Sequence, residues 1–381
     1  EISECDWSSD VCSSDLKEYL KRVNTTYHPY DGVTAFLQQA PQNEHSFLYA
    51  FNINYAFAEL ISEACIGHWT PEQGLSPITS WRAHKNEAEI AGFRRAMQHD
   101  GVAMVRFHRE LDEKVANGSI NQETEWSIAE RLEEIRAEHP EYHGLSFATI
   151  AGYAGNGAIV HYEATAENHA QLADKSFLLL DSGAHYVSGT TDITRTIPLG
   201  VLSDEEKKAY TLVLKGMIQL SMAHFPTGTT GLALDFAARQ SMWREGYDFG
   251  HGTGHGVGSH LCVHEGPHQI RKDRRAATEV PFQVGMTVSN EPGIYVADKF
   301  GVRLENVLVA QPAQQTPFGN FLKFETLTLC PLDLGPIVVE MLEPSERQWL
   351  NAYHEVVRAK LLPLLSDEKD KEWLLQATKA L

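Results

Sequence analysis

Apolar positions recur with two different spacings along this chain, and the change between them predicts where helices give way to strands. Residues 86–115 and 122–137 carry apolar side chains near every 3.6 positions, which predicts two amphipathic helices. After Leu145 the apolar runs become short and rich in β-forming residues. The strands expected in this part are residues 147–150, 159–162, 177–181 and 192–198.

The second half of the chain has the same mixture of patterns. Ser203 and Glu206 have the capping-box spacing, so we expect a helix from Ser203 to about His224. Strands and helices interleave without a regular β-α-β alternation, which predicts an α+β fold. The other expected elements are a helix over residues 232–246, strands over 286–290, 302–310 and 321–329, and helices over 344–364 and 368–381.

The N-terminal part is smaller, and its first residues stand apart. We expect a strand at residues 47–51, a helix at 55–66 and a connector marked by Pro71, Gly74 and Pro77. Residues 1–16 have neither a secondary-structure period nor the regions of a signal peptide. Their CDWSSDVCSSDL run is identified as the translation of a common sequencing-library adapter. We expect a disordered assembly artefact fused to an N-terminally truncated chain; the alternative is a genuine Ser/Asp-rich tail.

The composition excludes several classes of protein. The chain has 381 residues, 43% hydrophobic and 22% charged, as in an ordinary globular protein. Its net charge of −19, or −14 without the five acids of residues 1–16, would repel nucleic acid and anionic membranes, so neither is a predicted partner. No apolar run reaches the roughly 18 residues that span a membrane. Five cysteines make no disulfide scaffold in so long a chain. The three scattered cysteines that remain without residues 1–16 predict a reducing, cytoplasmic location.

Two aspartates mark the first cluster of chemistry-bearing residues, LLLDSGAHYVSGTTDITRT (178–196). Asp181 ends an apolar run, and Asp192 starts the returning strand beyond a glycine-containing reversal. On that strand Asp192, Thr194 and Thr196 share one face. Two facing carboxylates repel each other and raise one pKa, which a cation would relieve. Either residue alone is equally explained as a turn or strand-end aspartate.

Histidines dominate the second cluster, HGTGHGVGSHLCVHEGPH (251–268). Its glycines match neither GxGxxG nor a phosphate loop. His264 to His268 matches the zinc motif H-E-x-x-H, but Gly266 and Pro267 disfavour the helix which that motif requires. Apolar residues 261–263 suggest a partly buried strand, and a flexible surface loop is the other interpretation.

Two glutamates complete the set, in SNEPGIYV (289–296) and FGVRLENVLV (300–309). Glu291 precedes a Pro-Gly turn, and Glu305 lies in an expected buried strand, where it needs an ion-pair partner such as Arg303, or a metal. In chain order Asp181, Asp192, His255, Glu291 and Glu305 suit two hard divalent ions, with Mn²⁺ favoured over Zn²⁺ or Co²⁺. Such a pair supports metal-assisted hydrolysis.

These motifs resemble the pita-bread metallopeptidases, the group of methionine aminopeptidases, prolidases and Xaa-Pro aminopeptidases. The resemblance covers residues 83–331 and is greatest to the long, three-domain aminopeptidase P branch. It implies a pita-bread catalytic domain over residues 82–331, a partial creatinase-like domain over 17–81 and a C-terminal helical extension over 332–381. It also implies a homodimer in the full-length form.

The same resemblance implies a role for each site residue. Asp181, Asp192, His255, Glu291 and Glu305 would hold two metal ions, with Asp192 and Glu305 bridging them. Glu291 would also accept a proton from the attacking water, and His264 would hydrogen-bond the scissile carbonyl. His161 and His251 would contact the proline side of the substrate and the part beyond it. Arg303 would orient Asp192 or Glu305.

The implied activity is hydrolysis of the bond between an N-terminal residue and a penultimate proline. A prolidase that cleaves Xaa-Pro dipeptides is the near alternative, and the section after Pro331 favours the aminopeptidase. A non-catalytic pita-bread binding module is the other alternative, although such proteins lose metal ligands and all five are present here.

Overall fold

The computed structural model describes residues 18, 21–24, 32–39, 45–50, 53–64, 69–74 and 76–381. Its chain forms two compact units, residues 1–77 and 78–381. The predictions made for residues 1–16 lie outside the described residues. In the part of the chain that the structure describes, no helix is both long enough and apolar enough to cross a membrane.

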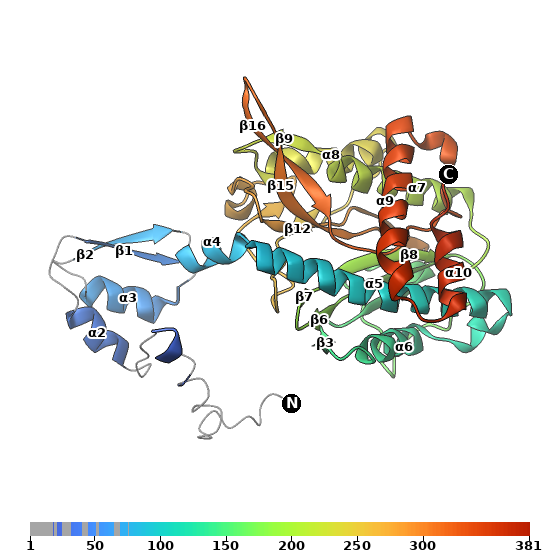
Figure 1. Ribbon diagram of the computed structural model, residues 1–381, viewed down its shortest axis with the longest axis horizontal. Helices are drawn as coiled ribbons and strands as arrows, with labels where there is room; N and C mark the ends of the chain where they lie inside the picture. Colours follow the sequence, from blue (N-terminus) through green and yellow to red (C-terminus); the bar gives the residue numbers. More distant parts are fainter. Residues whose placement is uncertain are drawn as a thin grey trace. The chain divides into compact units, whose positions relative to one another are not determined.

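The first unit contains a small β-α-β arrangement (Figure 1). Strand β1 (His45–Ala50) pairs in parallel with β2 (Trp69–Gly74), and α3 (Tyr55–Ala64) lies between them in sequence, after α2 (Val33–Gln39). The strand predicted at residues 47–51 and the helix predicted at 55–66 are confirmed. The predicted connector is wrong, because Pro71 and Gly74 belong to β2. Proline is tolerated there since both strands of a two-stranded sheet are edges.

The second unit is built from helices packed on antiparallel sheets. Its helices, starting with the one that crosses the boundary, are α4 (Pro77–Ala83), α5 (Glu87–Ala116), α6 (Glu125–Ala137), α7 (Asp204–Ser221), α8 (Gly231–Arg244), α9 (Pro344–Leu361) and α10 (Glu368–Ala377). Short 3-10 turns are η3 (Ser119–Gln122), η4 (Ala154–Ala158), η5 (Ala276–Glu279), η6 (Val339–Met341) and η7 (Leu362–Leu364). The predicted helices are confirmed to within a few residues, and capping boxes at Asn86 and Ser203 begin α5 and α7.

Two sheets form the frame of this unit. The first has the order β4-β5-β8 and the second the order β12-β15-β16-β9, and every pairing in them is antiparallel. Their strands are β4 (Ile150–Tyr153), β5 (Phe177–Ser182), β8 (Ile193–Pro198), β9 (His224–Pro226), β12 (Thr287–Asn290), β15 (Asn306–Thr316) and β16 (Gly319–Thr326). Smaller sheets are formed by β3 (Tyr142–Leu145), β6 (Ala184–Tyr186) and β7 (Gly189–Thr190), by β10 (Gly254–His255) and β11 (Gln269–Ile270), and by β13 (Gly293–Val296) and β14 (Phe300–Arg303).

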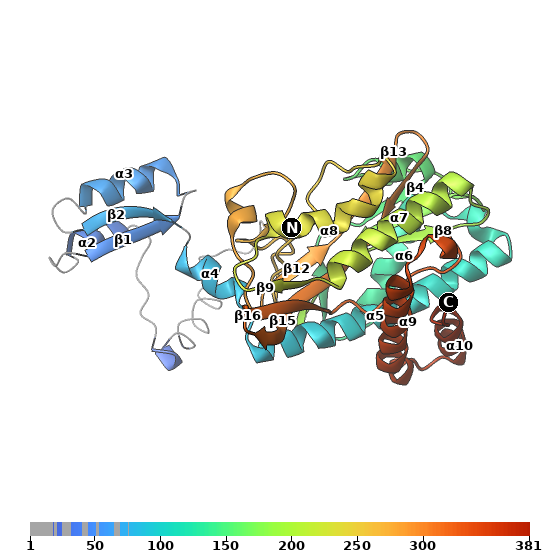
Figure 2. The ribbon, with the colours of Figure 1, turned by 90° about the horizontal axis from the view of Figure 1, so that it is seen from above.

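Each large sheet buries one face under a pair of helices. Helices α5 and α6 cover β5 and β8, where Phe107 and Leu132 meet Leu180 and Ile197 in one core cluster. Helices α7 and α8 run side by side (Figure 2) and share a second cluster with the other sheet. The other face of β5 and β8 packs in part against β14, and it carries the polar residues of the site.

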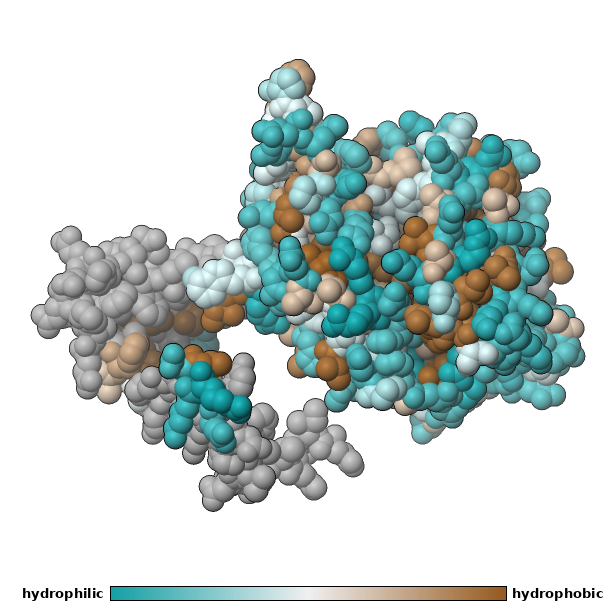
Figure 3. All heavy atoms as spheres, in the orientation of Figure 1, coloured by the Kyte–Doolittle hydropathy of each residue, from teal (hydrophilic) through white to brown (hydrophobic). Residues whose placement is uncertain are grey.

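The C-terminal helices belong to the same core as the rest of the unit. Leu350 and Val357 of α9 pack in one cluster with Val213 and Met217 of α7. The outside of the unit is mainly hydrophilic in the view of Figure 3, with separate hydrophobic areas. Scattered exposed apolar side chains of this kind are normal for a folded protein.

Several expected strands are wrong, and tertiary contacts explain the differences. Residues 159–162 form a turn after η4, because Tyr162 Oη donates to the buried Glu125 carboxylate at 2.7 Å. Residues 147–149 lie outside a strand, and β4 begins only at Ile150. The strand expected over 302–310 is interrupted at Glu305, whose amide donates to Thr194 O of β8 at 3.1 Å. Residues 261–263 are an irregular loop in which Leu261 is 52% exposed.

Arg195 joins the first sheet to the second sheet and to α9. Its fully buried guanidinium donates to the carbonyl oxygens of Glu305 (2.7 Å), Cys330 (2.8 Å) and Pro331 (3.0 Å), and lies 3.1 Å from Tyr353 Oη of α9. One cation thus satisfies several buried acceptors from three separate parts of the chain.

Replacing Arg195 with Met is expected to lower the free energy of unfolding by at least about 3 kcal/mol, since each buried acceptor that loses its donor costs about 1–3 kcal/mol. Urea denaturation of the full chain measures this change. The matched control is Arg106→Met on α5, which removes the more exposed pair with Glu138 and should cost about 0–1 kcal/mol. Equal losses in the two variants would contradict the role given to Arg195.

Candidate metal centre

A single cavity of about 560 Å³ brings the predicted site residues together. Phe147, Ile150 and Val160 give its wall an apolar part. The predicted residues that line it are Asp181, Asp192, His255, Glu291, Glu305, His161, His251, His264 and Arg303. Residues from five separate stretches of sequence therefore converge on one space.

The paired strands β5 and β8 position the two aspartates. Asp181 lies opposite Thr194 in the register, and Asp192 comes just before β8. Ile193 and Ile197 point into the helix-covered core, whereas Thr194 Oγ1 donates to Glu305 Oε2 at 2.8 Å. The predicted alternation along this strand is confirmed, and it directs Asp192 to the cavity side.

The glycines around His255 allow two strands to approach closely. A Cβ on Gly254 would lie 1.9 Å from Ser289 O of β12, so only glycine fits there. The His255 amide then lies 3.0 Å from Ser289 Oγ, and Ser289 Oγ lies 3.3 Å from Glu291 Oε1. This backbone contact sets His255 beside Glu291, with His255 Nε2 3.7 Å from Glu291 Oε1.

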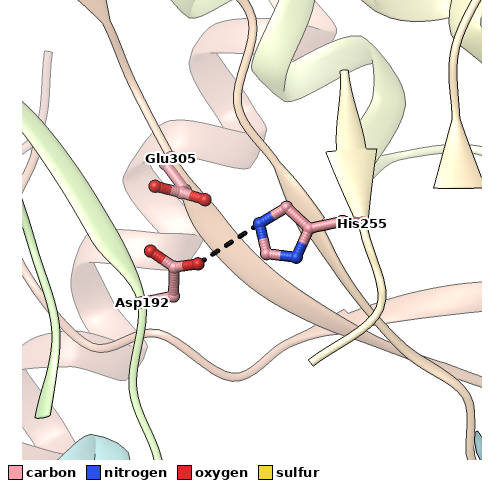
Figure 4. Close-up of side chains that lie close together, drawn as sticks. All are labelled: Asp192, His255 and Glu305. Atoms are coloured by element: carbon pink, nitrogen blue, oxygen red, sulfur yellow. Dashed lines mark ion pairs between the residues drawn. The ribbon is translucent and has the colours of Figure 1, made fainter. Parts of the chain in front are cut away.

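Asp192, His255 and Glu305 form the tightest group of possible ligands (Figure 4). One ligand atom from each lies within 4.8 Å of the others, and their side chains point toward one another. His255 Nδ1 is 2.9 Å from Gly256 O, so Nε2 is the nitrogen turned to the carboxylates. It lies 3.4 Å from Asp192 Oδ2.

The four carboxylates predicted as metal ligands destabilise one another as anions. Burial is the main cause of the raised pKa of Asp181, and Asp192 adds to it while Arg303 opposes it. Burial also raises the pKa of Glu305 well above its usual range, with further increases from the charges of Asp192, Asp181 and Glu291. Asp181 Oδ1 is buried and has no hydrogen-bond partner among the described residues.

Burial raises the pKa of Glu291 to about 7, although His255 and Arg303 oppose that rise. For His255 burial acts to lower the pKa, but the hydrogen bond to Asp192 and the charge of Glu291 raise it to about 9. His255 and Arg303 together supply two positive charges against four carboxylates, and the deficit is what bound cations would fill. The donor set of four carboxylates and one imidazole, with an unpartnered Asp181 oxygen, fits hard divalent ions.

Arg303 binds a different carboxylate from the one expected. Its Nη2 lies 2.6 Å from Asp181 Oδ2, whereas the sequence suggested Asp192 or Glu305. The expectation fails because Asp181 lies on β5, which packs against β14 in the fold. Thr194, rather than Arg303, donates to Glu305.

Sequence reasoning missed Tyr295. Its hydroxyl lies 2.8 Å from Arg303 Nη1 and 2.8 Å from His251 Nε2, so it connects the arginine to a predicted substrate residue. The sequence did contain a signal: Tyr295 lies four positions after Glu291, and in an extended segment residues at even spacing share one face. A lone tyrosine at this position is equally explained by packing.

The remaining predicted residues occupy different parts of the cavity lining. His161 and His264 are exposed, whereas His251 is half-buried against Tyr295. The His264 ring stands edge-on to the His255 ring, with centroids 4.2 Å apart. His268 also lines the cavity, yet its Nε2 is 2.8 Å from Thr287 O, a structural contact.

Comparison with known proteins gives a consistent family. The model of metallopeptidase family M24 matches residues 91–312, and that of the C-terminal region of peptidase M24 matches residues 320–381. A protein of Laccaria bicolor named probable Xaa-Pro aminopeptidase P is 44% identical over 78% of this chain and 47% of its own length. Aminopeptidase P1 of Lotus japonicus is 43% identical over 99% of this chain and 59% of its own length.

Solved structures show the same fold. A crystal structure of X-prolyl aminopeptidase from Caenorhabditis elegans, described as a cytosolic enzyme with a di-nuclear active site, aligns with a TM-score of 0.87 and 32% identity. The alignment covers 96% of this chain and 60% of the Caenorhabditis elegans chain. The prolidase from Pyrococcus furiosus aligns with a TM-score of 0.59 at 22% identity, over 79% of this chain and 80% of its own. The pita-bread, α+β fold predicted from the sequence is confirmed.

The chain spans only about half to three-fifths of the length of the curated relatives cited above. The M24 model nevertheless matches more than half of the chain itself. The protein therefore belongs to metallopeptidase family M24.

Proposed function

We propose that the protein is a dinuclear metal-dependent aminopeptidase that hydrolyses the bond between an N-terminal residue and a penultimate proline. The observation that carries the proposal is the convergence of Asp192, His255 and Glu305 in a cavity that Asp181 and Glu291 also line. The names of the similar fungal and plant proteins support the same activity.

Asp181, Asp192, His255, Glu291 and Glu305 would hold two divalent ions, with Asp192 and Glu305 shared between them. The oxygen-rich donor set favours Mn²⁺, with Zn²⁺ or Co²⁺ as alternatives. When bound, such ions act as Lewis acids that polarise the scissile carbonyl and activate water. Neutralising the mutual repulsion of the buried carboxylates is also what would make binding favourable.

Glu291 is the proposed proton acceptor for the attacking water. Its position against His255 and Ser289 keeps the carboxylate turned into the cavity, and its raised pKa suits proton transfer near neutral pH. His264 would donate a hydrogen bond to the carbonyl oxygen as negative charge develops there. Partial desolvation by the cavity wall, followed by the charge of His255, lowers the pKa of His264, so the ring would act in its neutral form, with one N–H to donate.

The chemistry of proline accounts for the substrate. An Xaa-Pro amide carries no N–H, so an enzyme that grips that hydrogen cannot use it. A cavity that recognises shape instead can accept the ring, and Phe147, Ile150 and Val160 offer apolar surface beside His161. His251, fixed by Tyr295, would contact the peptide beyond the proline.

The proposal extends to the domains, the cellular location and the oligomeric state of the protein. We assign residues 82–331 to catalysis, residues 17–81 to part of a creatinase-like domain and residues 332–381 to a C-terminal extension. The full-length form would be a cytoplasmic homodimer. Sedimentation of that form measures its mass directly.

Asp192→Asn is expected to remove metal binding and lower hydrolysis of an Xaa-Pro-Xaa tripeptide by at least about a hundredfold, since even the outer partners of metal ligands cost 10–100-fold. Chelator treatment of the wild type should have the same effect, and added Mn²⁺ should restore only the wild type. The matched control is Asp174→Asn, an exposed aspartate before β5. A wild type that binds no metal at saturating Mn²⁺ and hydrolyses nothing would support the binding-module alternative.

Substrate length separates the aminopeptidase from a prolidase. With Mn²⁺ present, Arg-Pro-Pro should be cleaved after its first residue, whereas Gly-Pro should remain intact because it offers nothing beyond the proline for His251 to contact. Product release is measured by chromatography under identical conditions. Faster hydrolysis of Gly-Pro than of Arg-Pro-Pro would identify a prolidase instead.

A further inference from the structure

The loop that carries His264 has a conformation that needs external support. It joins β10 to β11, and it has no regular secondary structure between Gly258 and Gly266. Leu261 and Cys262 lie in the left-handed region, at φ of 60° and 50°, which costs free energy for residues with a side chain. Contacts with the rest of the unit must therefore hold the loop in place.

Hydrogen bonds from Thr190 to Leu261 O and between His260 and Tyr186 O are two of those contacts, and Glu265, the neighbour of His264, makes the buried, charged one. Its carboxylate is 8% exposed and lies 2.6 Å from Lys85 Nζ and 2.5 Å from Arg82 Nη2. The Lys85 side chain is only 1% exposed, and burial lowers its pKa while Glu265 acts to raise it. The buried Lys85 charge is stabilised by Glu265, and the Glu265 charge is stabilised by Lys85 together with Arg82.

The Lys85–Glu265 pair joins a rigid frame to the histidines of the cavity. The Lys85 amide donates to Gly285 O at 3.1 Å, and the Gly285 amide donates to Ala310 O of β15 at 2.9 Å. On the other side, the Glu265 amide donates to Gly256 O at 2.7 Å. A Cβ on Gly256 would lie 1.9 Å from Glu265 O, so the loop rests directly on the backbone next to His255.

This geometry fixes His264 relative to His255. The two rings are in edge-on contact, and the residues that follow them, Gly256 and Glu265, are bonded through the backbone. A shift of Glu265 would move His264, whereas Asp181, Asp192, Glu291 and Glu305 lie on other strands and junctions. His255 keeps a separate hydrogen bond from its amide to Ser289 Oγ of β12, at 3.0 Å.

We propose that Lys85, assisted by Arg82, is a positioning residue that holds His264 at the scissile carbonyl through Glu265. The inference rests on the proposed function, because it gives His264 a substrate to contact. The two cations precede α5, far from the catalytic motifs in sequence, so they extend the functional unit to the start of that helix.

Lys85→Met tests this inference on the full chain. The variant should lower kcat/KM for Arg-Pro-Pro by about a hundredfold, the scale of loss that a 1 Å misplacement produces, while still binding two equivalents of Mn²⁺. The matched control is Arg94→Met, which breaks the exposed pair between α5 and Glu325 and should leave kcat/KM unchanged. Loss of Mn²⁺ binding in Lys85→Met would overturn the proposal, because it would indicate general disruption of the site.

A double-mutant cycle with His264→Ala separates positioning from a merely structural effect. If Lys85 acts through His264, adding Lys85→Met to His264→Ala should cause no further loss, as expected for residues that act as a unit. Losses that multiply would overturn the proposal. Arg82→Met keeps the Lys85–Glu265 pair intact and should fold even if Lys85→Met does not. It should lower kcat/KM less than Lys85→Met does, and it should cause no further loss when combined with His264→Ala.

Hydrogen exchange provides a readout independent of activity. In Lys85→Met, exchange should quicken at residues 258–266 and stay unchanged in β5 and β8. Suppose that the wild type hydrolyses no Xaa-Pro peptide, yet Lys85→Met speeds exchange at residues 258–266. The proposed function then fails, whereas the support of the loop by Lys85 is confirmed. If the wild type hydrolyses the peptide and exchange at residues 258–266 is unchanged in Lys85→Met, the positioning role of Lys85 is overturned.

Discussion

Electrostatic repulsion among the four carboxylates of the proposed metal site is the constraint on which the second unit depends. Asp181, Asp192, Glu291 and Glu305 line one cavity, where burial and their mutual charge raise the pKa of three of them. A fold gains no stability from such a group. The arrangement persists because the surrounding structure compels it and because cations would relieve it.

Positively charged side chains offset part of the negative charge of these carboxylates. Arg303 neutralises Asp181 from one side, and Tyr295 holds the arginine in turn. His255 offers its Nε2 to Asp192. Neither cation forms an ion pair with Glu305, whose carboxylate accepts, among the described residues, only the Thr194 hydroxyl. The least compensated of the four carboxylates is therefore Glu305, one of the two residues proposed to be shared by both metal ions.

The sequence was most informative where a residue's role follows from its neighbours in the chain. The helices were predictable from period and caps, as at Ser203, and the direction of Asp192 followed from strand alternation. The failures came from long-range contacts. Tyr162 leaves a strand-like run because Glu125 binds its hydroxyl, and Glu305 interrupts a strand because its amide bonds β8. The Asp181 partner of Arg303 was equally invisible, since 122 positions separate the two residues.

The C-terminal helices contribute to the geometry of the site, although they supply none of its proposed ligands. Arg195 lies on the core side of β8, one residue from Thr194, and its guanidinium holds the carbonyl of Glu305. The same guanidinium is bonded to Cys330 O and contacts the Tyr353 hydroxyl of α9. The position of Glu305 is thus fixed by its amide on Thr194, its carbonyl on Arg195 and its carboxylate on Thr194 Oγ1. All three bonds run to residues of β8, and Arg195 extends the contact to Tyr353 of α9, so the C-terminal region forms part of the support of the metal centre.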